Sequence, residues 1–165
     1  MTVVHAGHEG EALWFNNSLL TFKATSADTG GAFVLFEMLS RRGKATPLHL
    51  HPSEDESFYV LEGELLVHDD GRELCVGDGG FVCIPRGTPH AFTVTSETAR
   101  FLTLMTPGPL AAERFFHDGG EPARGRELPP DGPLDIARIQ ASAERHGSVQ
   151  LLGPPPFAEA GAALH

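Results

Sequence analysis

Three histidines and one glutamate in the middle of the chain have the types and the spacing of a metal-binding site. His49 and His51 flank Leu50, and in a strand two residues that lie two positions apart point to the same face. Glu56 opens the next expected strand, so its carboxylate can return to the same cavity. His90 follows a rigid, proline-containing turn that leads into a further strand. Together the four side chains predict a site for a divalent transition-metal ion.

The chemistry of this ligand set is that of an open metal site. Three neutral imidazoles and one carboxylate leave one or two coordination positions free for water, dioxygen or substrate. An open position distinguishes a catalytic metal site from a closed structural one. The same ligands suit Fe, Mn, Ni, Co, Cu and Zn, and the order of affinity follows the ion more than the site. The sequence therefore predicts one divalent ion without identifying it.

Residues on the same strand faces as these ligands predict an apolar pocket beside the ion. Phe58 and Val60 share the alternation of the ligand carboxylate, and Phe92 shares that of the third histidine. We therefore expect these three to line a substrate pocket for an apolar or aromatic molecule. They equally suit ordinary core, because the interior of a small barrel is its core. Tyr59 alternates to the opposite face, where we expect it to pack.

The other polar residues near the motif are predicted to have ordinary roles. Glu54 and Asp55 read as solvated loop acids, Arg86 as a surface cation and Arg41–Lys44 as a basic loop. A histidine by itself is most often a satisfied polar residue, and this interpretation covers His5, His8, His68, His117, His146 and His165.

Short segments with turns between them must position the ligands. The expected strands are Ala12–Phe15, Leu19–Thr25, Ala32–Leu39, Thr46–His51, Glu56–Leu61, Glu64–His68, Glu73–Val76, Phe81–Ile84, Ala91–Thr95 and Arg100–Thr106. Asp70-Gly71 is a strong hairpin signal, because both residue types tolerate positive φ. Many strands at a spacing of about ten residues favour a sandwich or barrel over βαβ units. The sequence thus predicts an all-β fold.

The C-terminal third of the chain has a different character. Leu110–His117 reads as a short helix, and Asp135–His146 as a second one with Asp135 as N-cap and Gly147 as its stop. The last fifteen residues read as a loose or lid-like tail. We therefore expect a barrel over residues 1–108, with the metal motifs in 43–94, and a helical and linker extension over 109–165. The extension is expected to pack against the barrel exterior.

Composition narrows the class of partner. The chain has 165 residues and a formal net charge of −10, which disfavours nucleic acid and membrane surfaces as partners. Its start has no signal-peptide pattern, so we expect a cytoplasmic protein. Two cysteines, Cys75 and Cys83, do not make a disulfide framework, and we expect both to be buried and reduced. A bridge across the hairpin that they flank remains an alternative.

Two longer patterns resemble the paired motifs of the cupin superfamily. The first comprises Gly43, five residues, His49-X-His51, four residues, Glu56, six residues and Gly63. The second comprises Gly79, five residues, Pro85-X-Gly87, two residues and His90. The Asn that usually closes the second motif is Val94 here; that Asn is not a metal ligand. The flanking segments, from LWFNNSLLTFKATSADTGGAFVLFEML to ERHGSVQLLGPPP, are similar to the quercetinase-like group of small bacterial cupins.

This resemblance implies a cupin double-stranded β-helix, or jelly-roll barrel, with short C-terminal helices. It also implies a homodimer with contacts through the N-terminal strands. For activity it implies a metal-dependent dioxygenase, similar to quercetin 2,3-dioxygenases, that acts on a small aromatic or enolisable substrate through Lewis-acid activation. Glu56 is then the catalytic residue, leaving the metal transiently to accept the substrate proton.

Two other functions fit the same residues. One is a non-oxidative, metal-dependent cyclase, isomerase or lyase in a biosynthetic pathway, because an enolate is stabilised by a Lewis acid with or without oxygen. The other is a small-molecule-binding cupin without turnover, because one fold hosts many functions. Product formation without oxygen, or binding without product, would identify them.

Overall fold

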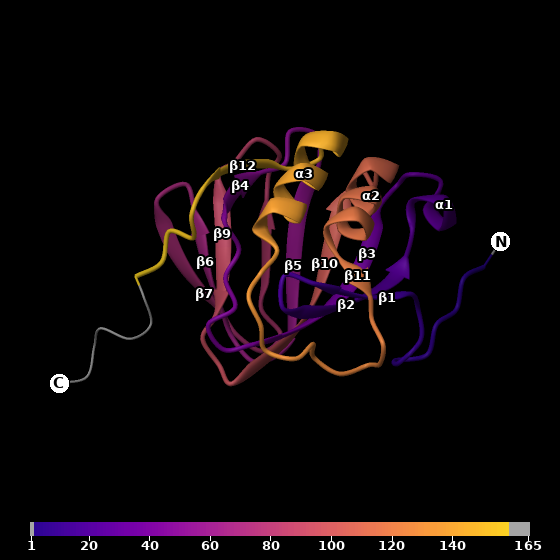
Figure 1. Cartoon of the computed structure of the whole chain (residues 1–165), viewed down its shortest axis with the longest axis horizontal. Coiled ribbons are helices and arrows are strands. Elements are labelled where there is room, and N and C mark those ends of the chain that lie inside the picture. Colours follow the sequence, from indigo (N-terminus) through magenta and orange to yellow (C-terminus); the bar gives the residue numbers. More distant parts are fainter. Residues whose placement is uncertain (1, 159–165) are drawn as a thin grey trace.

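Two antiparallel β-sheets face each other in the computed structural model, which describes residues 2–158 (Figure 1). The larger sheet has seven strands in the order β11-β1-β2-β3-β10-β5-β8. Their bounds are β1 Ala12–Phe15, β2 Ser18–Ala24, β3 Val34–Arg41, β5 Asp55–Glu62, β8 Phe81–Ile84, β10 Thr98–Thr106 and β11 Glu121–Pro122.

The second sheet has five strands in the order β12-β4-β9-β6-β7. Their bounds are β4 Leu48–Leu50, β6 Leu65–Asp69, β7 Arg72–Val76, β9 His90–Val94 and β12 Gln150–Gly153. Three helices complete the fold: α1 Ser26–Thr29, α2 Leu110–Gly119 and α3 Ile136–His146. The predicted all-β jelly roll with short C-terminal helices is therefore confirmed.

The core lies between the sheets because side chains alternate along each central strand. In β3, Val34, Phe36 and Met38 are buried while the residues between them are partly exposed. In the neighbouring β10, Phe101 and Met105 are fully buried by the same alternation. A period of two places one side of every strand in the core and the other toward the surface.

Tight turns hold the strands in register. Asn16 and Asn17 both have positive φ, 49° and 59°, and close the hairpin in which Phe15 pairs with Ser18. Two left-handed residues in succession give a turn whose twist matches that of the strands. Gly63, at the end of the first motif, has φ 90°, and a Cβ there would lie 2.3 Å from the Thr98 carbonyl oxygen. Only glycine fits that position.

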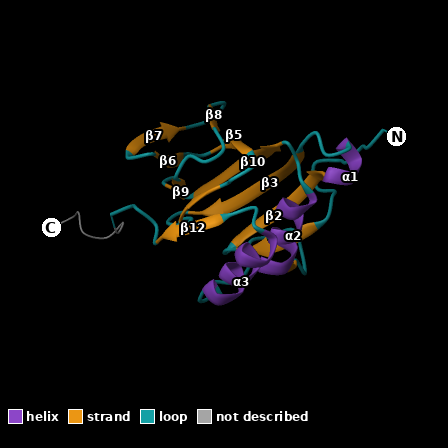
Figure 2. Ribbon diagram, turned by 90° about the horizontal axis from the view of Figure 1, so that it is seen from above, coloured by secondary structure: helices purple, strands orange, loops and turns teal. Residues whose placement is uncertain are grey.

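The helices α2 and α3 lie side by side against one flank of the sheets (Figure 2). Asp135 caps α3 by accepting a hydrogen bond from the Arg138 backbone N–H at 3.0 Å. Gly147 ends α3 with φ 67°, as predicted. Phe115 and Phe116 of α2 and Ile139 of α3 belong to the same buried cluster as the strand residues. No helix within residues 2–158 is long and apolar enough to cross a membrane.

Three expectations about exposure and order are wrong. Cys75 and Cys83 are free and exposed rather than buried, because each lies on the edge strand of its sheet. Tyr59, expected to pack, is 44% exposed, beside exposed Phe81 on the neighbouring edge strand. The start of the supposed loose tail is strand β12, which pairs with β4. Residues 159–165, the rest of that tail, lie outside the described residues.

Candidate metal centre

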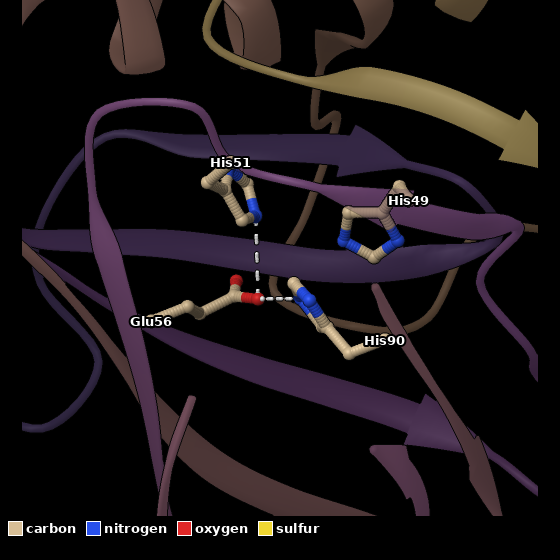
Figure 3. Close-up of side chains that lie close together, drawn as sticks. All are labelled: His49, His51, Glu56 and His90. Atoms are coloured by element: carbon tan, nitrogen blue, oxygen red, sulfur yellow. Dashed lines mark hydrogen bonds and ion pairs between the residues drawn. The ribbon is translucent and has the colours of Figure 1, made fainter. Parts of the chain in front are cut away.

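Three neighbouring segments bring the four predicted ligands together (Figure 3). His49 lies on β4 opposite His90, the first residue of β9. His51 follows β4 directly, and Glu56 lies near the start of β5. One ligand atom from each of the four can be chosen so that all lie within 4.8 Å of one another. The structure thus places these side chains around one point between the sheets.

The turn of the second motif is fastened to the first motif. The Gly87 backbone N–H donates to the His51 carbonyl oxygen at 2.8 Å. Arg86 donates to the Asp55 carboxylate from its backbone N–H at 2.9 Å and from Nε at 3.0 Å. Arg86 is a surface cation, as expected, and its ion pair joins the turn before His90 to Asp55, the strand residue next to Glu56. These bonds position His90 relative to His51.

Each histidine of the cluster has its Nδ1 atom occupied by a backbone carbonyl. His49 Nδ1 lies 2.8 Å from the Pro47 oxygen, His51 Nδ1 2.9 Å from the Ser148 oxygen, and His90 Nδ1 2.9 Å from the Thr88 oxygen. A carbonyl only accepts, so each ring carries its proton on Nδ1. The Nε2 lone pairs are then free and directed toward the centre of the cluster, as in metal-binding histidines.

The Glu56 carboxylate faces the Nε2 atoms of two of these histidines. Its Oε2 atom is 2.8 Å from His90 Nε2 and 3.3 Å from His51 Nε2. The His51 contact does not have hydrogen-bond geometry, which leaves His51 Nε2 a buried polar atom without a hydrogen-bond partner among the described residues. All four side chains are buried, with exposures of 8% or less. Buried acceptors that face one another require a cation between them.

The ionisation of the cluster reflects the same crowding. Burial, together with the facing His90 and His51 rings, lowers the pKa of His49 to about 3. Burial alone would raise the pKa of Glu56, but the His51 and His90 rings outweigh it and hold this pKa well below its usual value. Burial alone would lower the pKa of His51, but the Glu56 carboxylate outweighs it and raises this pKa. The cluster therefore combines an ionised carboxylate with a neutral imidazole at His49.

The residues present fit a divalent transition-metal ion. Three imidazole nitrogens and one carboxylate oxygen are hard-to-borderline donors of the kind that such ions prefer. The carbonyl partners on Nδ1 supply the outer hydrogen bonds that orient metal-binding rings. Nε2 of His51, which has no hydrogen-bond partner among the described residues, is available to bind a cation. A buried group of this composition could bind a metal, and its donor set does not specify which one.

An aromatic cavity adjoins the cluster. Its volume is about 60 Å³, it opens partly to solvent, and His49, His51 and Glu56 lie in its wall. Six phenylalanines line it: Phe15, Phe36, Phe58, Phe92, Phe115 and Phe116. Of the three expected pocket residues, Phe58 and Phe92 lie in this wall and touch edge to face at 5.3 Å. Val60 is fully buried in the core and is not part of the lining.

The C-terminal extension forms part of the site rather than packing only on the barrel exterior. Phe116 and Ile139, from α2 and α3, line the cavity, and the Ser148 carbonyl accepts the hydrogen bond from His51. The extension therefore lines the site in addition to packing against the flank of the sheets, a role that the sequence did not predict. The Phe115-Phe116 pair within a helical segment is the signal that could have indicated a buried face.

Two charged residues near the motif are also placed differently from the expectation. Glu54, expected to be solvated, is 1% exposed, and burial raises the pKa of its carboxyl. Lys44, expected in a basic loop, is 7% exposed and lines the cavity. Both follow a turn that folds inward between the sheets, and no local sequence signal indicates that direction.

Comparison with known proteins agrees with this fold and site. A two-sheet jelly roll with a buried cluster of three histidines and one glutamate, which could bind a metal ion, is an arrangement typical of cupins. The family model described as "Cupin domain" matches residues 36–107, a range that contains all four clustered residues. Over these residues the chain matches a cupin domain, in agreement with its fold.

Curated relatives include two dioxygenases. The chain is 29% identical to quercetin 2,3-dioxygenase of Bacillus subtilis (strain 168) over 121 residues, which are 73% of this chain and 35% of that protein. It is 37% identical to acireductone dioxygenase of Gluconacetobacter diazotrophicus over 54 residues, 31% of this chain and 30% of that protein. The chain thus matches only about a third of the length of these two relatives.

Solved structures show the same fold at low identity. KdgF from Halomonas sp. matches with a TM-score of 0.61 and 17% identity, over 68% of this chain and 99% of that chain. A predicted oxalate decarboxylase from Thermotoga maritima matches with a TM-score of 0.59 and 20% identity, over 64% of this chain and 99% of that chain. At these identities the likeness concerns the fold alone.

Proposed function

We propose that this protein is a metal-dependent dioxygenase that acts on a small aromatic or enolisable compound, with His49, His51, Glu56 and His90 as metal ligands. The observation that carries the proposal is the convergence of three Nε2 lone pairs and one carboxylate in the wall of a phenylalanine-lined cavity. The 29% identity to a quercetin 2,3-dioxygenase over most of the chain supports it.

A bound divalent ion would supply Lewis acidity, which lowers the pKa of a substrate hydroxyl or enol. Among the protein's own residues, Glu56 is the proposed proton acceptor. Its Oε2 atom faces His90 and His51, and no described residue donates a hydrogen bond to Oε1. That second oxygen is available to accept the hydroxyl proton of a substrate, and the low pKa of Glu56 keeps it ionised beforehand.

The cavity walls orient the substrate and exclude water. Phe58 and Phe92, which contact each other edge to face, both present ring surface to a planar molecule in the cavity. Aromatic contacts of this kind prefer edge-to-face or offset geometry, so they fix the plane of a substrate ring. Phe116, from α2, closes the cavity from the helical flank. Exclusion of water protects a deprotonated, electron-rich substrate from being reprotonated by solvent.

Oxygen uptake by the metal-loaded protein is the direct test. The protein is loaded in turn with Fe, Mn, Co, Ni, Cu or Zn and supplied with flavonols or β-diketones, with dissolved oxygen and product followed together. We expect oxygen to be consumed in proportion to substrate. Glu56→Gln is expected to reduce turnover by about 10²–10⁴-fold. Glu62→Gln, an exposed carboxylate on the same strand, is the matched control and is expected to leave turnover unchanged.

Three outcomes would overturn the proposal. Product formation at the same rate under strict anaerobiosis would identify a non-oxidative cyclase, isomerase or lyase. Substrate binding without product for every metal would identify a binding module. Full turnover by Glu56→Gln with unchanged metal content would remove Glu56 from the mechanism.

A further inference from the structure

Lys44 is a buried cation without a carboxylate partner in the aromatic cavity. It is 7% exposed and lines the same cavity as His49 and Glu56. The only hydrogen bond of its side chain within residues 2–158 runs from Nζ to the Ala45 carbonyl oxygen at 3.3 Å, which is long. Nζ lies 5.5 Å from the centre of the Phe92 ring. The ammonium group thus faces aromatic rings and unfilled space.

The inward direction of Lys44 is imposed by its backbone. Its N–H donates to the Arg41 carbonyl at 3.1 Å, and its carbonyl accepts from the Val94 N–H at 3.0 Å. Gly43, with φ 78°, turns the chain just before it and donates to the Val94 carbonyl at 3.0 Å. Residue 44 is therefore an added rung beside β9, and this pairing directs its side chain toward the cavity.

A cation in this position destabilises the fold unless something pairs with it. Burial is the cause that lowers the pKa of Lys44 to about 7, and no charged group shifts it back. An unpaired buried charge is among the costliest features of a protein interior. A methionine of similar length would fill the space without that cost. The ammonium group therefore points to a function that needs a positive charge.

A second polar group lines the same cavity as Lys44. Asn16 is 8% exposed, and its side chain makes no hydrogen bond within the described part of the chain. Asn16 and Lys44 both line the aromatic cavity, and both also line a neighbouring surface hollow that includes Arg41. They therefore lie where the cavity meets the surface. A carboxamide N–H and an ammonium group are both hydrogen-bond donors to an anionic oxygen.

We propose that Lys44, with Asn16 of the same cavity wall, binds a carboxylate of an aromatic acid in this cavity. The inference deepens the proposed function, and rests on it, by assigning an aromatic acid as the substrate class. The carboxylate pairs with the ammonium group while the ring lies among the phenylalanines. A different hydroxyl of the same molecule would then be the one whose proton Glu56 accepts. In a protein with a net charge of −10, such a local cation is what allows an anion to enter.

Binding of a matched pair of probes tests the anchor without catalysis. The full chain is titrated calorimetrically with 2-naphthoate and with 2-naphthamide, its neutral analogue, both as purified and after chelation of metals. The chelated sample separates binding at Lys44 from binding to a metal. We expect naphthoate to bind about tenfold or more tightly than naphthamide in both samples, since charge-assisted hydrogen bonds exceed neutral ones by at least that factor.

Substitutions then locate the preference. Lys44→Met is expected to lose the tenfold preference by weakening naphthoate while leaving naphthamide unchanged. Lys44→Arg is expected to retain a preference for the acid. Arg72→Met, which removes an exposed cation on β7, is the control for net charge and should retain the full preference. Thermal melts of each variant establish that it is folded.

Equal binding of the two probes to the parent chain, or no binding of either at millimolar concentration, would overturn the anchor. A preference that survives Lys44→Met would also overturn it. Because these titrations need neither metal nor oxygen, they separate the two ideas. A chain that oxidises neutral flavonols yet shows no acid preference keeps its proposed function and loses this inference.

Discussion

Nε2 of His90 lies 2.8 Å from Oε2 of Glu56, although the proton of a neutral His90 ring is already engaged by the Thr88 carbonyl at Nδ1. A lone pair and a carboxylate oxygen at that distance repel each other unless a cation lies between them. The cation is either an additional proton or a metal ion. In a buried site with His51 and His49 nearby, a divalent ion satisfies more acceptors than one proton does.

Removal of one imidazole is expected to abolish metal binding. In His90→Ala or His49→Ala, we expect metal content, measured by elemental analysis, to fall from about one ion per chain to near zero. The loaded parent chain should also lose stability on chelation, since a ligand at a hundred times its Kd contributes about 2.7 kcal/mol. His5→Ala, at an exposed position, is the control and should bind normally. Full metal occupancy in His90→Ala would contradict the assignment.

Lys44 makes stability depend on pH in a defined direction. Its pKa is about 7 in the folded chain against 10.5 as the reference value, so between these values the unfolded chain holds more protons. The free energy of unfolding therefore rises with pH across this window. Lys44→Met removes that rise and should be more stable at pH 7 by on the order of 1–3 kcal/mol. Urea unfolding of both chains at pH 7 and pH 9.5 measures the difference.

This comparison controls for the other titrating groups. His49, His51 and Glu56 share the cavity with Lys44 and are unchanged in Lys44→Met, so their contributions cancel to first order. Both chains must be measured in the same metal state. If the two chains gained stability in parallel between pH 7 and pH 9.5, Lys44 would not be the source of the rise.

Phe92 is expected to determine substrate affinity without affecting the metal. It packs edge to face against Phe58 at 5.3 Å and lines the cavity. Phe92→Leu keeps the site apolar but removes ring contacts worth about 0.5–1.5 kcal/mol, which corresponds to a loss of affinity of roughly two- to tenfold. Phe22→Leu is the matched control, because Phe22 is equally buried but does not line the cavity. A titration with an aromatic ligand, alongside metal analysis, compares the two variants.

The outcome that would contradict this role is an equal loss of affinity in the two variants. Such a result would show that loosening the core anywhere weakens binding, and Phe92 would then be ordinary core. A loss of metal from Phe92→Leu would show instead that the ring positions His90.

Local sequence signals are sufficient to predict most of the strands and helices. The alternation through Val34, Phe36 and Met38 predicts β3, and the cap and stop at Asp135 and Gly147 predict the bounds of α3. These features depend on neighbours in the sequence. The four clustered side chains were also predicted as a group, because a period of two and a fixed loop length decide which face each occupies. Their binding of a metal remains a prediction.

The errors arise where burial depends on distant segments. Cysteine is a residue type common in the core, but Cys83 is exposed because β8 is an edge strand. The order of strands in a sheet cannot be deduced from the local sequence. Lys44 and Glu54 have the residue types of a loop surface, but their turns fold between the sheets. Ser148 contributes only a backbone carbonyl, which any residue has, so no residue type could have indicated it.

The role of the C-terminal extension in the site gives the last prediction. The Ser148 carbonyl holds Nδ1 of His51 at 2.9 Å, and β12 fixes that segment against β4. A chain ended after Gly147 loses this acceptor and the β12 pairing, while the ligand-bearing strands keep their other partners. Loss of such an outer hydrogen bond typically costs metal affinity 10–100-fold. Competition with a chromophoric chelator measures the change, and circular dichroism establishes that the sheets remain. A chain ended after Ala158 retains every residue that lines the site and should bind metal as tightly as the full chain. Equal affinity in both truncated chains would mean that the extension only covers the barrel and that His51 is held by its other contacts.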